Sequence, residues 1–111
     1  MRTHSHTLTA LADPTRRSIV ERLRTGPRSV ADLARGLPVS RPAVSQHLAV
    51  LKQSGLVSEE RAGRQRIYRL EVRGLEPLRA YVDELWTDVL GAYRAAAVAE
   101  AGSDSTEENE R

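Results

Sequence analysis

The feature that most constrains this chain is a pair of short amphipathic helices, joined by a tight connection, in the first half of the sequence. Ser29 and Asp32 have the spacing of a capping box and predict a helix of about two turns, which Gly36 should end in a left-handed conformation. Ser40 predicts the start of a second helix over residues 40–54. Its buried face should consist of apolar residues at helical spacing: Val44, Leu48 and Leu51. Two such helices in succession predict a helix-turn-helix.

Two further helices are predicted before this pair. Leu8, Leu11 and Ala12 have helical spacing and indicate a short first helix. Asp13 can cap a second helix over residues 14–25, in which a proline occupies the first position.

After the pair, the pattern changes to that of a β-hairpin followed by a long helix. Residues 56–57 and 65–70 resemble short strands, with residues 61–64 as the turn between them. Because a two-stranded hairpin is barely stable alone, it should pack on the helices and leave its arginine-rich tip projecting as a wing. From about residue 75 to Ala101, apolar residues recur every three or four positions and predict a long helix.

These elements predict a mainly α (α+β) fold, a winged helix-turn-helix with about five helices and a two-stranded β-hairpin wing. The length of 111 residues fits one compact domain, which we place at residues 1–101. Residues 102–111 are rich in Ser, Glu and Asp, and they should form a disordered acidic tail.

The basic residues are concentrated in the middle of the chain. The whole sequence has a net charge of +2, but residues 14–73 hold 13 basic and 5 acidic residues, a net charge of +8, and the remainder sums to −6. A basic block suits a polyanion such as nucleic acid, because each phosphate contact releases condensed counterions. An arginine-rich surface that is merely solvated is the open alternative.

The outer side of the second helix of the pair carries polar groups near its N-terminal end, which is the end that a recognition helix presents to the major groove. Glutamine can bond adenine bidentately, arginine can bond guanine, and serine can donate to bases or phosphates. We expect Arg41, Ser45 and Gln46 to read bases rather than only decorate an exposed helix. His47 is equally suited to a bond within the protein, and Lys52 to a phosphate contact or to solvent.

The predicted hairpin is rich in arginine. It carries Arg61, Arg64, Arg66 and Arg69, and Gly63 permits a tight turn that projects the first two beyond the strands. They should meet the minor groove or the DNA backbone, although a charged edge also keeps a sheet from aggregating. The residues expected to contact double-stranded DNA are Ser40, Arg41, Ser45, Gln46, His47, Lys52, Arg61, Arg64 and Arg66.

The core available to one subunit is modest, since 40% of the residues are hydrophobic, with no Phe and one Trp. A dimer that shares apolar area would add stability. The apolar stripe of the long helix could be a ligand pocket or a dimer seam, and its spacing suits a seam better. The residues expected in a dimer interface are Leu8, Leu11, Leu78, Val82, Leu85, Trp86 and Val89.

Several classes of site lack support. The chain has no cysteine, no Gly-rich phosphate loop and nothing that assembles into an active site. We therefore expect no enzymatic activity, no cofactor and no specific metal site, although His4 and His6 form a ligand-like pair. No apolar stretch resembles a signal peptide or a membrane span, so we expect a cytoplasmic protein that does not contact the membrane.

Several motifs together resemble those of ArsR-type winged-helix repressors, over about residues 7–95. They are Asp13-Pro14-Thr15-Arg16-Arg17, Ser40-Arg41-Pro42-Ala43-Val44-Ser45-Gln46-His47-Leu48, Leu51-Lys52, Gly55-Leu56-Val57, Gly63-Arg64 and Tyr68. The resemblance implies a homodimer, joined by its first and last helices, that binds an imperfect palindrome. It also implies that Ser45, Gln46 and His47 read the groove, with the wing arginines as supporting contacts.

The resemblance breaks down where metal-responsive members bind their metal. Those members commonly carry a Cys-x-Cys pair before the recognition helix, where residues 30–34 of this chain hold no cysteine. Others use histidine and carboxylates on the last helix, where this chain offers only Asp83, Glu84 and Asp88. The chain is therefore closer to the autorepressor branch, whose members lack an evident metal site.

We expect a sequence-specific DNA-binding regulator that represses transcription from a palindromic operator. Two alternatives stay open at this point. One is a winged-helix module that binds another protein, and the other is a repressor controlled by an unidentified small effector.

Overall fold

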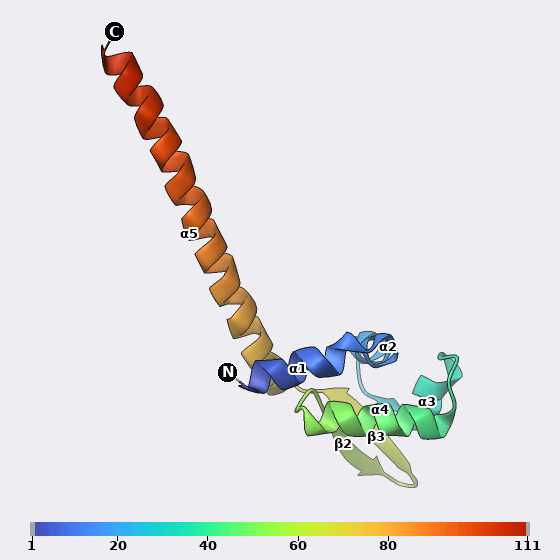
Figure 1. Ribbon diagram of the computed structural model, residues 1–111. Helices are drawn as coiled ribbons and strands as arrows, with labels where there is room; N and C mark the ends of the chain where they lie inside the picture. The colour runs from blue at the N-terminus through green and yellow to red at the C-terminus, as the bar shows by residue number, and fades with distance from the viewer. Residues whose placement is uncertain (1, 111) are drawn as a thin grey trace. The chain divides into compact units, whose positions relative to one another are not determined.

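The computed structural model describes residues 2–110, with side chains described for residues 4–102. Figure 1 shows the elements, which are α1 (Arg2–Ala12), α2 (Pro14–Leu23), β1 (Arg28–Ser29), α3 (Val30–Arg35), α4 (Arg41–Gln53), β2 (Val57–Ala62), β3 (Gln65–Leu70) and α5 (Val72–Glu110). The predicted winged helix-turn-helix is confirmed. Contacts divide the chain into two units, Met1–Arg79 and Ala80–Arg111.

The helix starts follow the predicted capping residues. Asp13 caps α2 and accepts hydrogen bonds at Oδ1 from the backbone N–H groups of Thr15 at 2.8 Å and Arg16 at 3.0 Å. These bonds, that of Arg16 above all, hold the pKa of the Asp13 carboxyl below its ordinary value. Ser29 caps α3 by accepting from the Asp32 N–H at 3.1 Å, which confirms its predicted role.

The end of α3 differs from the prediction at Gly36. This residue has a φ of −99°, so the expected left-handed conformation is wrong. The helix ends instead in tight turns, in which the Gly36 N–H donates to Leu33 O and the Leu37 N–H donates to Ala34 O, each at 3.3 Å. Such turns need no positive φ. Gly36 is required by space, because a Cβ atom there would collide with the guanidinium of Arg22.

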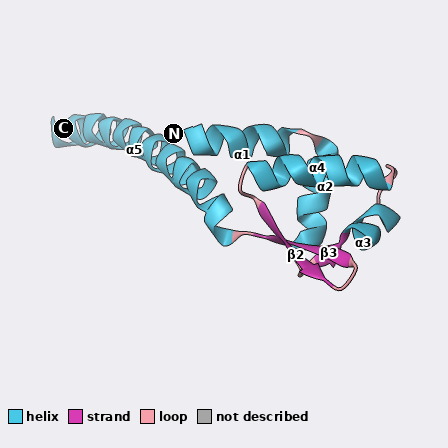
Figure 2. Cartoon of the chain, turned by 90° about the horizontal axis from the view of Figure 1, so that it is seen from below, coloured by secondary structure: helices cyan, strands magenta, loops and turns pink. Residues whose placement is uncertain are grey.

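The sheet has three antiparallel strands in the order β1-β3-β2, and Figure 2 shows the hairpin of β2 and β3 in magenta beside α3. The strand β1 was not predicted. The predicted turn over residues 61–64 is too long, because Arg61 pairs with Arg66 and Ala62 pairs with Gln65 inside the ladder. Only Gly63 and Arg64 form the turn. Gly63 has a φ of +65°, and a glycine with positive φ in the first position is the requirement of a type II′ hairpin.

The core lies between the inner face of α4 and the elements around it. Val44, Leu48 and Leu51 are fully buried, as predicted. They join a cluster from α1, α2, α3 and the sheet, whose other members are Ala10, Ile19, Leu23, Leu33, Leu56, Val57 and Tyr68. Because one side of α4 is held in this cluster, its opposite side must face outward.

The helix α5 begins three residues earlier than expected and passes the expected end near Ala101. Its start is anchored to the turn after α4, since the Glu71 N–H donates to Leu56 O at 2.9 Å. The prediction that residues 102–111 form a disordered tail concerns a segment whose side chains, beyond Gly102, lie outside the described ones, and it stays a prediction.

Two glycines of α5 provide a matched test of this packing. A Cβ atom at Gly74 would collide with the backbone carbonyl of Gly55, whereas one at Gly91 would meet open space. We expect Gly74→Ala to lower the free energy of unfolding by about 1–3 kcal/mol. Gly91→Ala should raise it by up to about 1 kcal/mol, because alanine has the higher helix propensity. Urea unfolding measures both, and equal stability of the two variants would contradict the contact.

Candidate nucleic-acid interface

The candidate interface is formed by the outer face of α4 and the hairpin wing. Ser40 starts α4 and accepts the Ala43 N–H at 3.3 Å, so its side chain serves as the predicted cap. Arg41, Ser45 and Gln46 are exposed on the outer face. The burial of Val44 and Leu48 on the other side of the helix produces this division.

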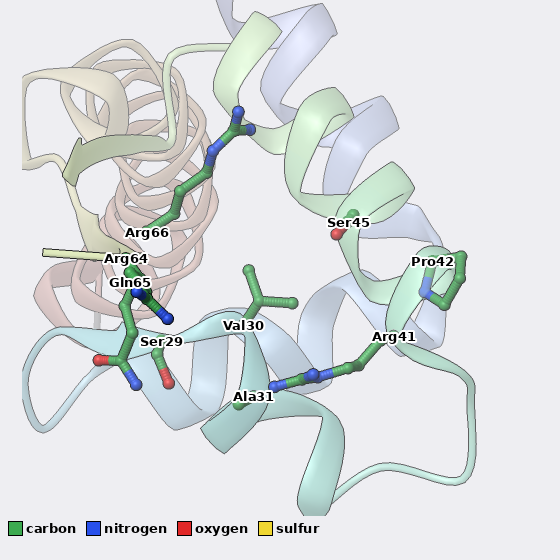
Figure 3. A pocket seen from close by; sticks show the side chains of 9 residues that line it. All are labelled: Ser29, Val30, Ala31, Arg41, Pro42, Ser45, Arg64, Gln65 and Arg66. Carbon is green, nitrogen blue, oxygen red and sulfur yellow. The ribbon is translucent and has the colours of Figure 1, made fainter. Parts of the chain in front are cut away.

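A hollow lies between the start of α4 and the wing, and Figure 3 shows the side chains that line it. Those lining residues are Ser29, Val30, Ala31, Arg41, Pro42, Ser45, Arg64, Gln65 and Arg66. The structure therefore brings together four residues of the predicted set from two separate elements. The guanidinium groups make the hollow basic, which suits an anionic ligand.

The arginines of the wing differ in what they contact. Arg61 and Arg64 are exposed at the tip, and within residues 4–102 neither forms an ion pair. Arg69 is paired with Glu60 across the hairpin. Arg61 also lies directly opposite Arg66 in the ladder, and like charges at such positions repel. The tip therefore keeps uncompensated positive charge.

His47 points away from the other candidate readers. Its ring is half-buried, and its Nδ1 lies 3.4 Å from Nη1 of Arg16. Arg16 is itself held by α1, since its Nε donates to Ala10 O at 2.7 Å. Of the two roles that the sequence left open for His47, a contact within the protein is present in the structure.

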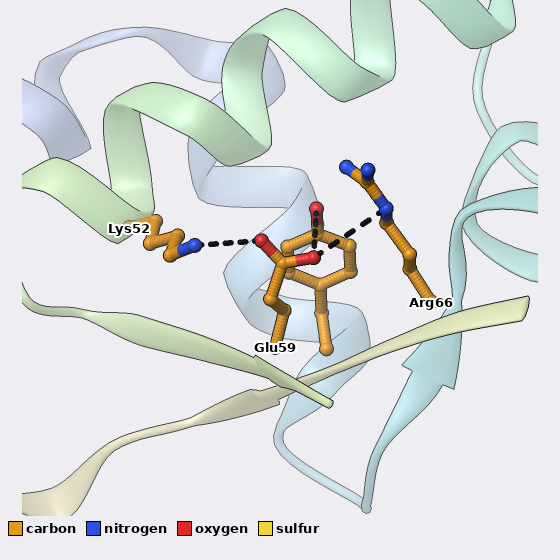
Figure 4. Close-up of polar contacts among 4 residues, drawn as sticks. Lys52, Glu59 and Arg66 are labelled. Atoms are coloured by element: carbon orange, nitrogen blue, oxygen red, sulfur yellow. Dashed lines mark hydrogen bonds and ion pairs between the residues drawn. The ribbon is translucent and has the colours of Figure 1, made fainter. Parts of the chain in front are cut away.

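Lys52 and Arg66 share one carboxylate, as Figure 4 shows. Lys52 Nζ lies 2.6 Å from Glu59 Oε1, and Arg66 Nε lies 3.7 Å from Glu59 Oε2. The hydroxyl of buried Tyr68 donates to Glu59 Oε2 at 3.4 Å. The hydrogen bond from Lys52 holds the pKa of Glu59 below its ordinary value, so this carboxyl is ionised at neutral pH.

The sequence analysis missed Glu59. The residue lies in β2, in register with Tyr68 of β3. A side chain opposite a buried tyrosine faces the helices rather than solvent, because side chains alternate along a strand. That alternation could have identified Glu59, but only with the correct strand boundaries, and the predicted first strand ended at Val57.

The predicted dimer residues fall in both units. In the first unit Leu8 is 43% exposed, while Leu11 and Leu78 are partly buried. In the second unit an exposed apolar row follows one side of α5, consisting of Val82, Leu85, Trp86 and Val89. Such a row exceeds the scattered apolar residues of an ordinary monomer surface.

Two further searches cover only the described residues. There, no three side chains of the types His, Cys, Asp and Glu are grouped so that they could hold a metal ion. None of the described helices combines the length and the apolar character needed to cross a membrane.

Comparison with known proteins points to one family. Residues 13–59 match the family described as "Bacterial regulatory protein, arsR family". Over 96 residues the chain is 54% identical to the HTH-type transcriptional regulator Rv2034 of Mycobacterium tuberculosis, and the match covers 86% of this chain and 89% of that protein.

Solved structures agree with this similarity. An ArsR-like transcriptional regulator from Rhodococcus sp. RHA1 has a TM-score of 0.72 and 31% identity, covering 87% of this chain and 90% of its own. A homodimeric winged helix-turn-helix DNA-binding domain, Mb0332 of Mycobacterium bovis, has a TM-score of 0.64 and 28% identity, covering 80% of this chain and 82% of its own.

Proposed function

This chain belongs to the arsR family of bacterial regulatory proteins, and on that premise we propose that it represses transcription as a homodimer bound to a palindromic operator. In this proposal helix α4 enters the major groove. The wing arginines contact the neighbouring backbone or minor groove.

The division of α4 into two faces is the observation that carries the proposal. Its inner face is fully buried, and the outer face presents Arg41, Ser45 and Gln46 beside a basic hollow. These side chains offer the donors and acceptors that read base edges. The uncompensated charge of Arg61 and Arg64 would be neutralised by phosphates.

A winged-helix module that binds another protein is the competing function. It would be expected to present an apolar patch on α4 or the wing. The exposed large apolar side chains of the described residues lie mainly on α5, including Trp86 and Val89, while the outer face of α4 beside the wing is polar and basic. This distribution favours DNA at α4 and a second copy of the chain at α5.

The homodimer is supported by the exposed row on α5 and by the described homodimeric state of the Mb0332 domain. A symmetric pair would place two copies of α4 about 34 Å apart, one turn of the DNA helix. The operator would then be palindromic, because each copy reads the same half-site.

Two substitutions separate base reading from phosphate contact. On a duplex selected by the native protein, Gln46→Ala should cost about 1–3 kcal/mol and relax the preference at one base position. Arg64→Ala should weaken selected and random duplexes alike and lower the salt slope by about 0.9. Binding titrations at several salt concentrations measure both effects. An equal loss on both kinds of duplex for Gln46→Ala would exclude base reading by this residue.

The dimer is tested on one helix with one type of substitution. Val89→Glu places a charge in the exposed apolar row, and we expect it to yield monomers in sedimentation velocity and to lose most operator affinity. Thr87→Glu is the matched control, because Thr87 lies two residues away and about 200° around the helix. The proposal fails if Val89→Glu sediments as the native protein does, or if Thr87→Glu dissociates equally.

A further inference from the structure

We propose that Glu59 sets the selectivity of the interface for its operator: its carboxylate holds Lys52 and Arg66, which keeps these two cations from binding phosphates of any DNA sequence. This inference rests on the proposed DNA binding. It assigns opposite roles to basic residues that the sequence placed in one group. Arg61 and Arg64 contact phosphates, whereas Lys52 and Arg66 are withheld from them.

The position of Glu59 is the first support. A second hollow lies between the outer face of α4 and the wing, lined by Ser45, Ala49, Lys52, Gln53, Glu59, Arg66 and Tyr68. Glu59 is the only acidic residue of this lining, and its side chain is 23% exposed. The carboxylate therefore faces the surface that approaches DNA, where it would repel phosphates.

The geometry of the carboxylate is the second support. Its two oxygens have different partners, Lys52 on Oε1 at 2.6 Å and Arg66 on Oε2 at 3.7 Å. Tyr68 also donates to Oε2 and is buried, so the carboxylate is oriented by a side chain that cannot move freely. Two cations from two elements thus converge on one oriented anion, as Figure 4 shows.

A phosphate can bind either cation only by competing with this carboxylate. Binding to non-specific DNA depends almost entirely on phosphate contacts, whereas binding to an operator also uses base contacts. A non-specific complex can take up any cation that is free, while a specific complex fixes α4 in one register. Withholding Lys52 and Arg66 should therefore weaken non-specific binding more than operator binding.

Glu59→Gln tests this role, and Glu60→Gln is its control. Glu60 is the next residue of β2, and it is exposed and paired with Arg69. Both substitutions remove one negative charge from the wing, but only the first releases Lys52 and Arg66. Binding is measured on a random duplex and on a duplex selected by the native protein, each from about 50 to 200 mM salt.

We expect Glu59→Gln to bind the random duplex about two- to fivefold more tightly than the native protein does at low salt, which is the effect of about one exposed charge pair. Its salt slope on that duplex should become steeper by about 0.9 to 1.8, because one or two more phosphate contacts form. The ratio of selected to random affinity should fall. Glu60→Gln should leave the slope unchanged.

Two results would overturn the inference. One is a Glu59→Gln protein with the same slope as Glu60→Gln, and the other is a uniform loss of affinity without a change of slope, which would make Glu59 a structural residue only. If the native protein binds neither duplex, the proposed function itself fails, and this outcome is distinct from the other two.

Lys52→Gln provides an independent test that does not require Glu59→Gln to fold. If Lys52 is withheld from phosphates, its replacement should leave the salt slope on random DNA unchanged. Arg64→Gln should lower that slope by about 0.9. An equal decrease for both variants would show that Lys52 binds phosphate, and it would overturn the inference.

Discussion

The burial of one side of α4 is the interaction on which the rest of the structure depends. Val44, Leu48 and Leu51 are fully buried among residues from every neighbouring element. At about 0.8 kcal/mol for each buried CH2 group, these contacts outweigh any preference of the polar side chains for orientation. The helix cannot rotate without exposing them. The direction in which Ser45 and Gln46 point is therefore a consequence of the core.

The wing depends on the same core through Tyr68. This residue is buried beneath the hairpin, pairs with Arg28 of β1 and donates to Glu59 of β2. It thereby joins all three strands to the helices, and a hairpin that would be unstable alone is held in place. The positively charged tip is carried on a fixed base. The basic residues around it are not equivalent, since some are neutralised by carboxylates of the wing and others are not.

The correct predictions from sequence were those that rest on local signals. The caps at Asp13, Ser29 and Ser40, and the buried face of α4, follow from spacings of three and four residues. Features that depend on distant contacts were missed. The pairing of β1 with β3, the true length of the hairpin strands, and the carboxylate of Glu59 beneath Lys52 all require segments far apart in the chain to meet. Gly36 was assigned the wrong conformation for the same reason, because Arg22 dictates its size.

The central claim is that a symmetric pair of α4 helices reads DNA through their outer faces. Selection of bound duplexes from a random pool tests it most directly, because the sequences themselves report both the reading and the symmetry. The account predicts a two-fold symmetric consensus whose half-sites are centred about 10 base pairs apart. A pool that yields no consensus, or a single unrepeated half-site, would contradict it.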